Sequence, residues 1–265
     1  MKKLLATSSI ALALGLAAAP ANAFIVDGIE VDAGATLAVA DVYEDTVLAV
    51  GDTLSGIGQV GFIKNKFGAF TWLSGDNGRE LTFAFDGFIL ETVVPTTQGA
   101  DLYFSGGHAE FYSDATPDFS INQGQAANLA NATDGDLWLG VTAAASYGTC
   151  GILPIAGTCL NGDATGITLI SSVNSANLAA VSGGDGAAFF DAVSGSALNN
   201  FDTDGVGGLY DFDASFDFDD FPPTGDYDLS GSADFKAAPI AEPVSLGLMG
   251  AGLAGLGLLG RRKKA

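Results

Sequence analysis

The chain has 265 residues, of which 31 are acidic and 10 basic, and its formal net charge at pH 7 is −21. A charge of this sign repels nucleic acids and anionic lipid surfaces, so neither is an expected partner of the folded protein. Eighteen phenylalanines, six tyrosines and two tryptophans are too many aromatic residues for a disordered chain. The sequence therefore predicts a folded, acidic protein.

The N-terminus has the parts of a secretory signal peptide over residues 1–23. A basic start precedes the apolar stretch Leu4–Ala19, and Ala21 and Ala23 are the small residues of a signal peptidase site. A buried helix of a cytosolic protein is the alternative, but it does not account for these three features together. We expect cleavage after Ala23, so that the exported protein begins at Phe24.

The body, residues 24–236, is rich in glycine and poor in lysine, arginine and glutamate. This composition favours short strands joined by turns over long helices. Leu81, Phe83 and Phe85 alternate with other residues, which predicts a strand with one apolar face after a turn. Asp101–Tyr112 is predicted to be a hairpin that turns at its Gly-Gly pair.

Further elements follow in the second half of the body. Asp136–Val141 is predicted to be a strand, and Gln123–Asn131 or Asn174–Val181 a short helix. We therefore expect an all-β fold, a β-sandwich-like body of two packed antiparallel sheets. An N-terminal signal helix and a C-terminal transmembrane helix would flank this body.

Cys150 and Cys159 are the only cysteines of the chain. In an exported protein an even number of cysteines predicts a disulfide, which here would close a short loop. A redox or metal role is not expected, because there is no C-x-x-C motif and the single histidine is distant in sequence.

Tyr210–Asp219 has the clearest strand pattern, because its even-numbered residues are apolar and its odd-numbered residues are aspartates and one serine. Pro222-Pro223 is predicted to end this strand, and Tyr227–Phe235 to return beside it. The aspartates are best interpreted as a solvated face that keeps an edge strand from aggregating.

Calcium is the alternative interpretation of the acidic residues. Asp202-Thr203-Asp204-Gly205 is similar to the start of an Asp/Gly calcium loop, in which Asp202 and Asp204 would be ligands. The segment lacks the third aspartate and the closing glutamate of an EF-hand. We therefore expect no cofactor, with Ca²⁺ at these two residues as the alternative.

Few residues of the body have a recognisable chemistry. His108 has no G-x-S-x-G partner motif and is interpreted as a residue at a turn. Trp72 and Trp138 can fill the core or stack on sugar rings. Lys64 and Lys66 form a basic spot, which is expected to be a surface turn rather than a ligand clamp.

The C-terminus has three parts. Glu242 and Pro243 precede the uncharged apolar segment Val244–Gly260, which is at the short end of what spans a bilayer. A basic cluster follows, and basic residues stay on the cytoplasmic side. Its residues are Arg261, Arg262, Lys263 and Lys264. We expect a linker and sorting motif over 237–243, a transmembrane helix over 244–260 and a cytoplasmic tail over 261–265; a flexible glycine-rich tail is the alternative.

This arrangement of motif, span and basic cluster resembles the PEP-CTERM sorting signal of exosortase substrates in Gram-negative bacteria. The family pattern is Pro-Glu-Pro, and this chain has Ala241-Glu242-Pro243. The resemblance implies that signal peptidase and an exosortase process the protein. It also implies transient anchoring in the inner membrane, delivery to the cell surface or the extracellular space, and a link to exopolysaccharide and biofilm or floc formation.

The sequence therefore predicts an exported matrix protein with a structural or adhesive role toward exopolysaccharide, and no enzymatic activity. Two alternatives remain open. One is a carbohydrate-binding module that exposes Trp72 and Trp138. The other is a secreted polysaccharide hydrolase, which would need a pocket with two carboxylates.

Overall fold

The computed structural model describes residues 23–32, 34–144, 166–204, 210–224 and 226–237. They lie within one compact unit, Ala23–Pro239. Within these ranges no helix has the length and apolar character needed to span a membrane. The predicted signal helix, sorting motif, transmembrane helix and basic tail lie outside the described residues, as do Cys150 and Cys159 and their predicted disulfide.

Most of the described chain is β-strand, and the helices are short. The strands are β1 (Phe24–Val26), β2 (Ile29–Val31), β3 (Thr36–Glu44), β4 (Thr53–Lys64), β5 (Phe70–Leu73), β6 (Glu80–Pro95), β7 (Ala100–Asp114), β8 (Asp136–Ala144), β9 (Ile167–Val173), β10 (Gly183–Ser194), β11 (Phe212–Thr224) and β12 (Tyr227–Ala237). The helical segments are η1 (Asp76–Gly78), α2 (Gln125–Ala132), η2 (Leu178–Ala180) and α3 (Leu198–Phe201).

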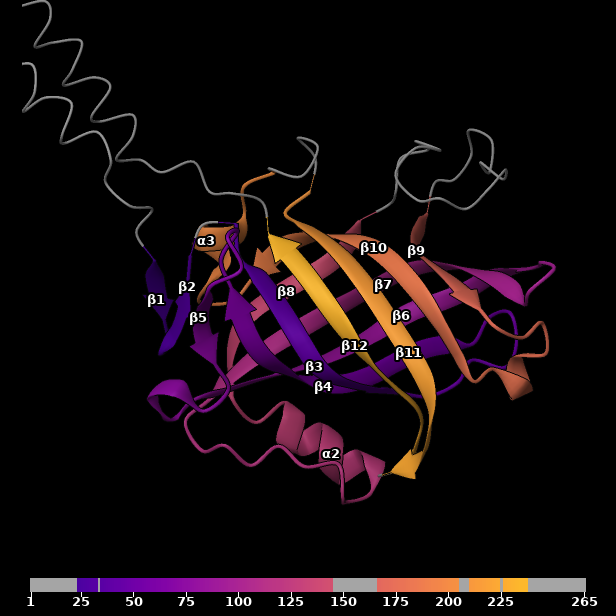
Figure 1. The fold of residues 1–265 in the computed structure, drawn as a ribbon, viewed down its shortest axis with the longest axis horizontal. Helices are drawn as coiled ribbons and strands as arrows, with labels where there is room; N and C mark the ends of the chain where they lie inside the picture. Colours follow the sequence, from indigo (N-terminus) through magenta and orange to yellow (C-terminus); the bar gives the residue numbers. More distant parts are fainter. Residues whose placement is uncertain (1–22, 33, 145–165, 205–209, 225, 238–265) are drawn as a thin grey trace, which may run out of the picture. The chain divides into compact units, whose positions relative to one another are not determined.

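The large sheet closes on itself. Strands β11, β12, β3, β4, β6, β7, β8 and β10 are hydrogen-bonded in that order, and every pairing is antiparallel. β10 also pairs with β11, from Gly183 opposite Asp219 to Phe190 opposite Phe212, which joins the two ends of the series. Figure 1 shows β3, β12 and β11 crossing in front of β6, β7 and β8.

β8 and β9 share one position in this ring. β7 pairs with β8 along His108–Ser113 and with β9 along Ala100–Ser105. β10 pairs with β9 and then β8 in the same way. The long strands β7 and β10 therefore bridge two shorter strands that follow one another end to end.

The prediction of an all-β, antiparallel body is confirmed. Two walls of the sheet face each other across the core, as the sheets of a sandwich do. The difference from two separate sheets is the β10–β11 ladder, which connects the walls and satisfies the edge hydrogen bonds of both strands. β11 lies between β10 and β12, so the prediction that it is an edge strand is wrong.

The alternating pattern directs apolar side chains into the closed sheet. At one end aromatic rings fill the interior, with Phe201 in contact with Trp138 at 5.5 Å and with Phe212 at 5.2 Å between ring centroids. Phe24, the first residue of β1, also packs on Phe201 at 5.8 Å. We call this region the packed end.

α2 covers part of the outer surface of the sheet. It lies beside β4 and β6 (Figure 1), where Ala132 packs with Ile57 and Tyr227 in a second, small apolar cluster. The hydroxyl of Thr82 donates a hydrogen bond to the carbonyl oxygen of Ala132 at 2.8 Å. The helix predicted over Gln123–Asn131 is therefore confirmed, within a residue or two of its ends.

Several other local predictions are confirmed. Leu81, Phe83 and Phe85 lie on the core side of β6, and Asp136–Val141 belongs to β8. β12 returns antiparallel beside β11. Of the alternative helix Asn174–Val181, only the single turn η2 is present.

The predicted hairpin over Asp101–Tyr112 is wrong, because β7 runs straight through this segment. Gly106 and Gly107 have φ angles of 69° and 96°, yet both stay within the strand. A Cβ atom on Gly107 would lie 2.3 Å from the ring of Phe88 on β6. The glycine therefore allows the close approach of an aromatic ring and does not reverse the chain.

Two predictions for the aspartate-rich segment Tyr210–Asp219, most of which lies in β11, are also wrong. Pro222-Pro223 does not end β11, which continues to Thr224 through an irregular stretch of its pairing with β12. Asp211 does not face solvent with the other aspartates, because it precedes the strand and is only 2% exposed.

Candidate functional site

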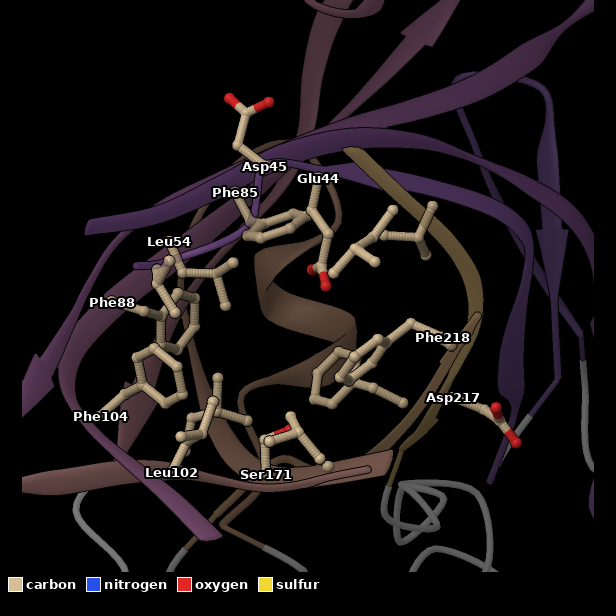
Figure 2. A pocket seen from close by; sticks show the side chains of 18 of the residues that line it. Glu44, Asp45, Leu54, Phe85, Phe88, Leu102, Phe104, Ser171, Asp217 and Phe218 are labelled. Carbon is tan, nitrogen blue, oxygen red and sulfur yellow. The ribbon is translucent and has the colours of Figure 1, made fainter. Parts of the chain in front are cut away.

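The end of the closed sheet opposite Trp138 and Phe201 encloses a cavity, which we call the hollow end. Residues of β3, β4, β6, β7, β9, β10, β11 and β12 line it. The centre of a water molecule can occupy about 80 Å³ of this space, whereas one buried water needs about 10–15 Å³. Its wall is formed mainly by apolar side chains (Figure 2), among them Leu54, Phe85, Phe88, Leu102, Phe104 and Phe218.

Small residues create the space. Ala109, Gly186 and Ala233 line the cavity at positions where the alternation of their strands directs side chains inward. Protein interiors are otherwise close-packed, and an inward-pointing alanine or glycine leaves the volume that a larger side chain would fill. The cavity therefore follows from the residue sizes on three strands of the wall, β7, β10 and β12.

One carboxylate points into this apolar space. Of the three acidic residues along the cavity, Glu44, Asp45 and Asp217, only Glu44 is directed inward in Figure 2. Glu44 is the last residue of β3 and follows the buried Val42 by two positions, so the strand period places its side chain on the inner face.

The surroundings of Glu44 disfavour its charged form. Burial and, to a smaller extent, the negative charge of Asp45 together raise the pKa of Glu44 to about 7. Among the described residues, none donates a hydrogen bond to this carboxylate and no lysine, arginine or histidine lines the cavity. An ionisable group without a partner thus faces an apolar space.

Glu80 is a second acidic residue with a raised pKa, but in contrast to Glu44 its carboxylate has hydrogen-bond donors. Glu80 is 2% exposed, and its carboxylate accepts hydrogen bonds from the backbone N–H groups of Asp118 (2.8 Å) and Phe119 (3.1 Å) and from Nε2 of Gln59 (2.9 Å). Burial raises the pKa of Glu80, and the charges of Asp118 and Asp114 add to this, while the two backbone hydrogen bonds lower it.

Glu80, Asp114 and Asp118 are the described residues whose carboxylate oxygens come within 4.8 Å of one another, as a metal site requires. The oxygens of Glu80 are already occupied by protein donors. A cation bound here would have to replace or share those hydrogen bonds, so the residues fit a structural anchor of the Asp118–Phe119 segment better than a metal centre.

The predicted calcium ligands Asp202 and Asp204 lie in an exposed loop after α3. This loop is organised by Asp211, whose carboxylate accepts hydrogen bonds from the N–H groups of Thr203, Asp204 and Ala192. Burial raises the pKa of the nearby Asp191, and the charges of Asp211, Asp204 and Asp202 add to this. The structure therefore brings the four carboxylates of Asp191, Asp202, Asp204 and Asp211 close together. The loop itself is held by hydrogen bonds from its backbone N–H groups to Asp211.

The other residues singled out in the sequence do not converge on the cavity. His108 is exposed in the middle of β7, opposite Asp86 and Thr142. Trp72 and Trp138 are 1% and 0% exposed, so neither ring is available to stack on a sugar. Since a single carboxylate points into the cavity, the carboxylate pair of a hydrolase is not found there.

Lys64 and Lys66 lie at the tip of the β4–β5 hairpin beside three aromatic rings. Lys64 Nζ lies 4.4 Å from the ring centroid of Phe62 and 5.1 Å from that of Phe70, and Lys66 Nζ lies 5.2 Å from that of Phe67. Phe67 is 81% exposed and Phe70 58%. We call residues 62–73 the hairpin tip.

Of the residues named for the two targeting signals, the structure describes Ala23 and Phe24, which flank the predicted signal cleavage site. Ala23 is exposed, and Phe24 begins β1. Ala21 and the sorting residues Glu242, Pro243, Arg261, Arg262, Lys263 and Lys264 lie outside the described residues.

Comparisons with protein-family models, curated proteins and solved structures found no match to this chain. Its candidate site is therefore defined by geometry alone.

Sequence reasoning missed both Glu44 and Glu80. The signal for Glu44 was its spacing of two residues from Val42 in an apolar strand. An irregularity in the pairing of β3 with β4, between Ala38 and Asp41, interrupts the period and hides this signal.

Proposed function

We propose that the body of this protein binds a small apolar molecule inside the closed sheet. The observation that carries the proposal is the cavity at the hollow end, with its apolar wall and single inward carboxylate. Ligand sites in proteins are typically concave and mainly apolar, with few polar groups that fix orientation.

Physical chemistry supports occupation by an apolar ligand. Water inside such a cavity finds few hydrogen-bond partners, because Phe88, Phe104 and most other lining groups offer none. A ligand that displaces this water buries its own apolar surface against the aromatic rings, and each Å² of apolar surface removed from water contributes about 25 cal/mol. The rings are held by continuous ladders, so the site is largely formed before binding.

The targeting signals give this binding function a location. The signal peptide around Ala21 and Ala23 would export the body, and the C-terminal signal that includes Glu242 and Pro243 would bring it to an exosortase. The protein would then hold its ligand at the cell surface or in the extracellular matrix.

The test is binding of an uncharged apolar dye, N-phenyl-1-naphthylamine, whose fluorescence rises in an apolar site. Ala233→Phe fills the cavity and is expected to weaken dye binding at least about tenfold, because the ring occupies the ligand volume. Ala130→Phe, on the exposed side of α2, is the matched control. Equal dye binding by both folded variants would contradict the proposal.

A second candidate function is adhesion to exopolysaccharide, the role expected from the sorting signal. The hairpin tip favours it, because Phe67 and Phe70 are exposed next to two of the four basic residues of an otherwise acidic body. Exposed aromatic rings are suited to contact sugar rings, and lysines to contact anionic groups of a polymer.

Adhesion is tested by co-sedimentation with exopolysaccharide from the producing cells. Phe67→Ser with Phe70→Ser is expected to reduce the bound fraction several-fold, whereas Leu129→Ser, at an exposed apolar residue of α2, leaves it unchanged. A double variant that sediments like the parent protein would exclude the tip as the adhesive surface.

A further inference from the structure

The unpartnered carboxylate of Glu44 restricts the kind of ligand that the cavity can take. Polar groups inside proteins are almost always hydrogen-bonded, and above pH 7 the ionised form of Glu44 accepts hydrogen bonds but does not donate them. Glu44 points into the apolar space (Figure 2), and no described residue supplies a donor to it. A ligand that fills the space therefore either leaves this group unsatisfied or brings a donor of its own.

Three of the polar residues that line the cavity do not take this role. The Ser171 hydroxyl donates its hydrogen to the carbonyl oxygen of Asp185 at 2.9 Å. The Asp45 side chain is directed away from the cavity (Figure 2) and accepts a hydrogen bond from Nε2 of Gln125 at 2.5 Å. The remaining acidic lining residue, Asp217, is exposed and also directed away.

The charge of the body favours a cation over other donors. The basic residues Lys64, Lys66, Arg79 and Lys236 do not line the cavity, and they stand against thirty acidic residues in the body. An anionic headgroup in the cavity would be repelled by Glu44 and by the surrounding field. An ammonium group would be attracted by both and would donate to the carboxylate.

We propose that the ligand is an apolar molecule that carries a positively charged amine, and that Glu44 is the hydrogen-bonded partner of the ammonium group. This inference rests on the proposed function, because it names the ligand class of the same cavity. The aromatic side chains Phe85, Phe88 and Phe218 would contact the apolar part of the ligand, and Glu44 would fix its orientation.

Three ligands that share an octyl chain and differ only in their headgroup show how much the headgroup contributes to binding. Octylamine, octanol and octanoate are added to the folded protein at pH 8, below the solubility limit of octanol and the micelle concentrations of the other two, and displacement of N-phenyl-1-naphthylamine is measured. Octylamine is expected to bind at least about tenfold more tightly than octanoate, with octanol between them, because a charge-assisted hydrogen bond forms only with the amine.

Glu44→Gln tests the role of the carboxylate. Octylamine binding is expected to fall about tenfold, while octanol binding changes less than about threefold. Asp234→Asn is the matched control, because it removes one charge from an exposed position on the outside of β12 and is expected to leave all three affinities unchanged.

A second variant covers the case in which Glu44→Gln does not fold. Glu44→Asp keeps the charge but withdraws it by one methylene, so octylamine binding falls and octanol binding does not. The proposal is overturned if octanol binds and octylamine binds no more tightly, or if the variants lower both affinities equally. If neither the dye nor any octyl compound binds, the proposed function itself fails.

Discussion

The two ends of the closed sheet are built by the same strands but have different interiors. On β11, Phe212 at the packed end is 1% exposed and touches Phe201, whereas Phe216 at the hollow end is only partly buried and lines the cavity. The comparison shows that alternation decides which side chains point inward. Their sizes then decide whether the space between them is filled.

The buried Glu80 and the half-buried Glu44 also differ in their surroundings. Glu80 is surrounded by three hydrogen-bond donors that hold one segment of chain, and Glu44 has none among the described residues. A buried carboxylate with hydrogen-bond donors is structural, whereas a carboxylate that has no donor and faces an apolar cavity is a candidate for ligand contact.

The largest expected effect on stability is a difference between substitutions at the packed end and at the hollow end. Phe212→Ala is expected to lower the free energy of unfolding by about 4 kcal/mol, because it leaves a cavity among closely packed rings. Phe216→Ala on the same strand should cost only about 1–2 kcal/mol, since its ring is partly exposed and borders an existing space. Urea unfolding of both variants measures the difference, and equal losses would remove the distinction between the two ends.

Replacing the structural glutamate should have the next largest effect. Glu80→Ala is expected to lower the free energy of unfolding by about 3 kcal/mol, because the N–H groups of Asp118 and Phe119 lose their acceptor. Glu80→Gln retains an acceptor oxygen and is the control, with a smaller loss expected. Equilibrium unfolding at pH 7 compares the two, and a neutral effect of Glu80→Ala would argue against an anchoring role.

Replacing the cavity glutamate should act in the opposite direction and depend on pH. The pKa of Glu44 is about 7 in the folded protein, against an ordinary value of 4.5. Between these values the folded protein binds more protons than the unfolded chain, so the free energy of unfolding falls as the pH rises. Glu44→Gln removes this loss and is expected to stabilise the protein at pH 8 by about 2–3 kcal/mol, with little effect at pH 4.

Unfolding curves of Glu44→Gln and the parent protein at pH 4 and pH 8 measure this difference. Asp234→Asn is again the control, because its exposed side chain lies on the outer face of the sheet. A stability difference that is the same at both pH values would show that the surroundings of Glu44 do not raise its pKa.

Much of the local structure could be predicted from the sequence. The strand around Phe83 and the helix after Gly124 have regular patterns that depend on near neighbours only. The hairpin at Gly106-Gly107 was mispredicted, because glycine also serves close packing and the partner ring of Phe88 is distant in sequence. The orientation of Asp211 could not be predicted either, since its hydrogen-bond donors come from other segments.

The sequence by itself determined the β class, the alternation that directs aromatic side chains inward, and the acidic outer surface, because these depend on composition and on the strand period. The tertiary structure alone decided that β10 pairs with β11, that the small residues Ala109, Gly186 and Ala233 surround one space, and that Glu44 faces it. These features depend on contacts between segments far apart in the chain, and strand register cannot be read from any one of those segments.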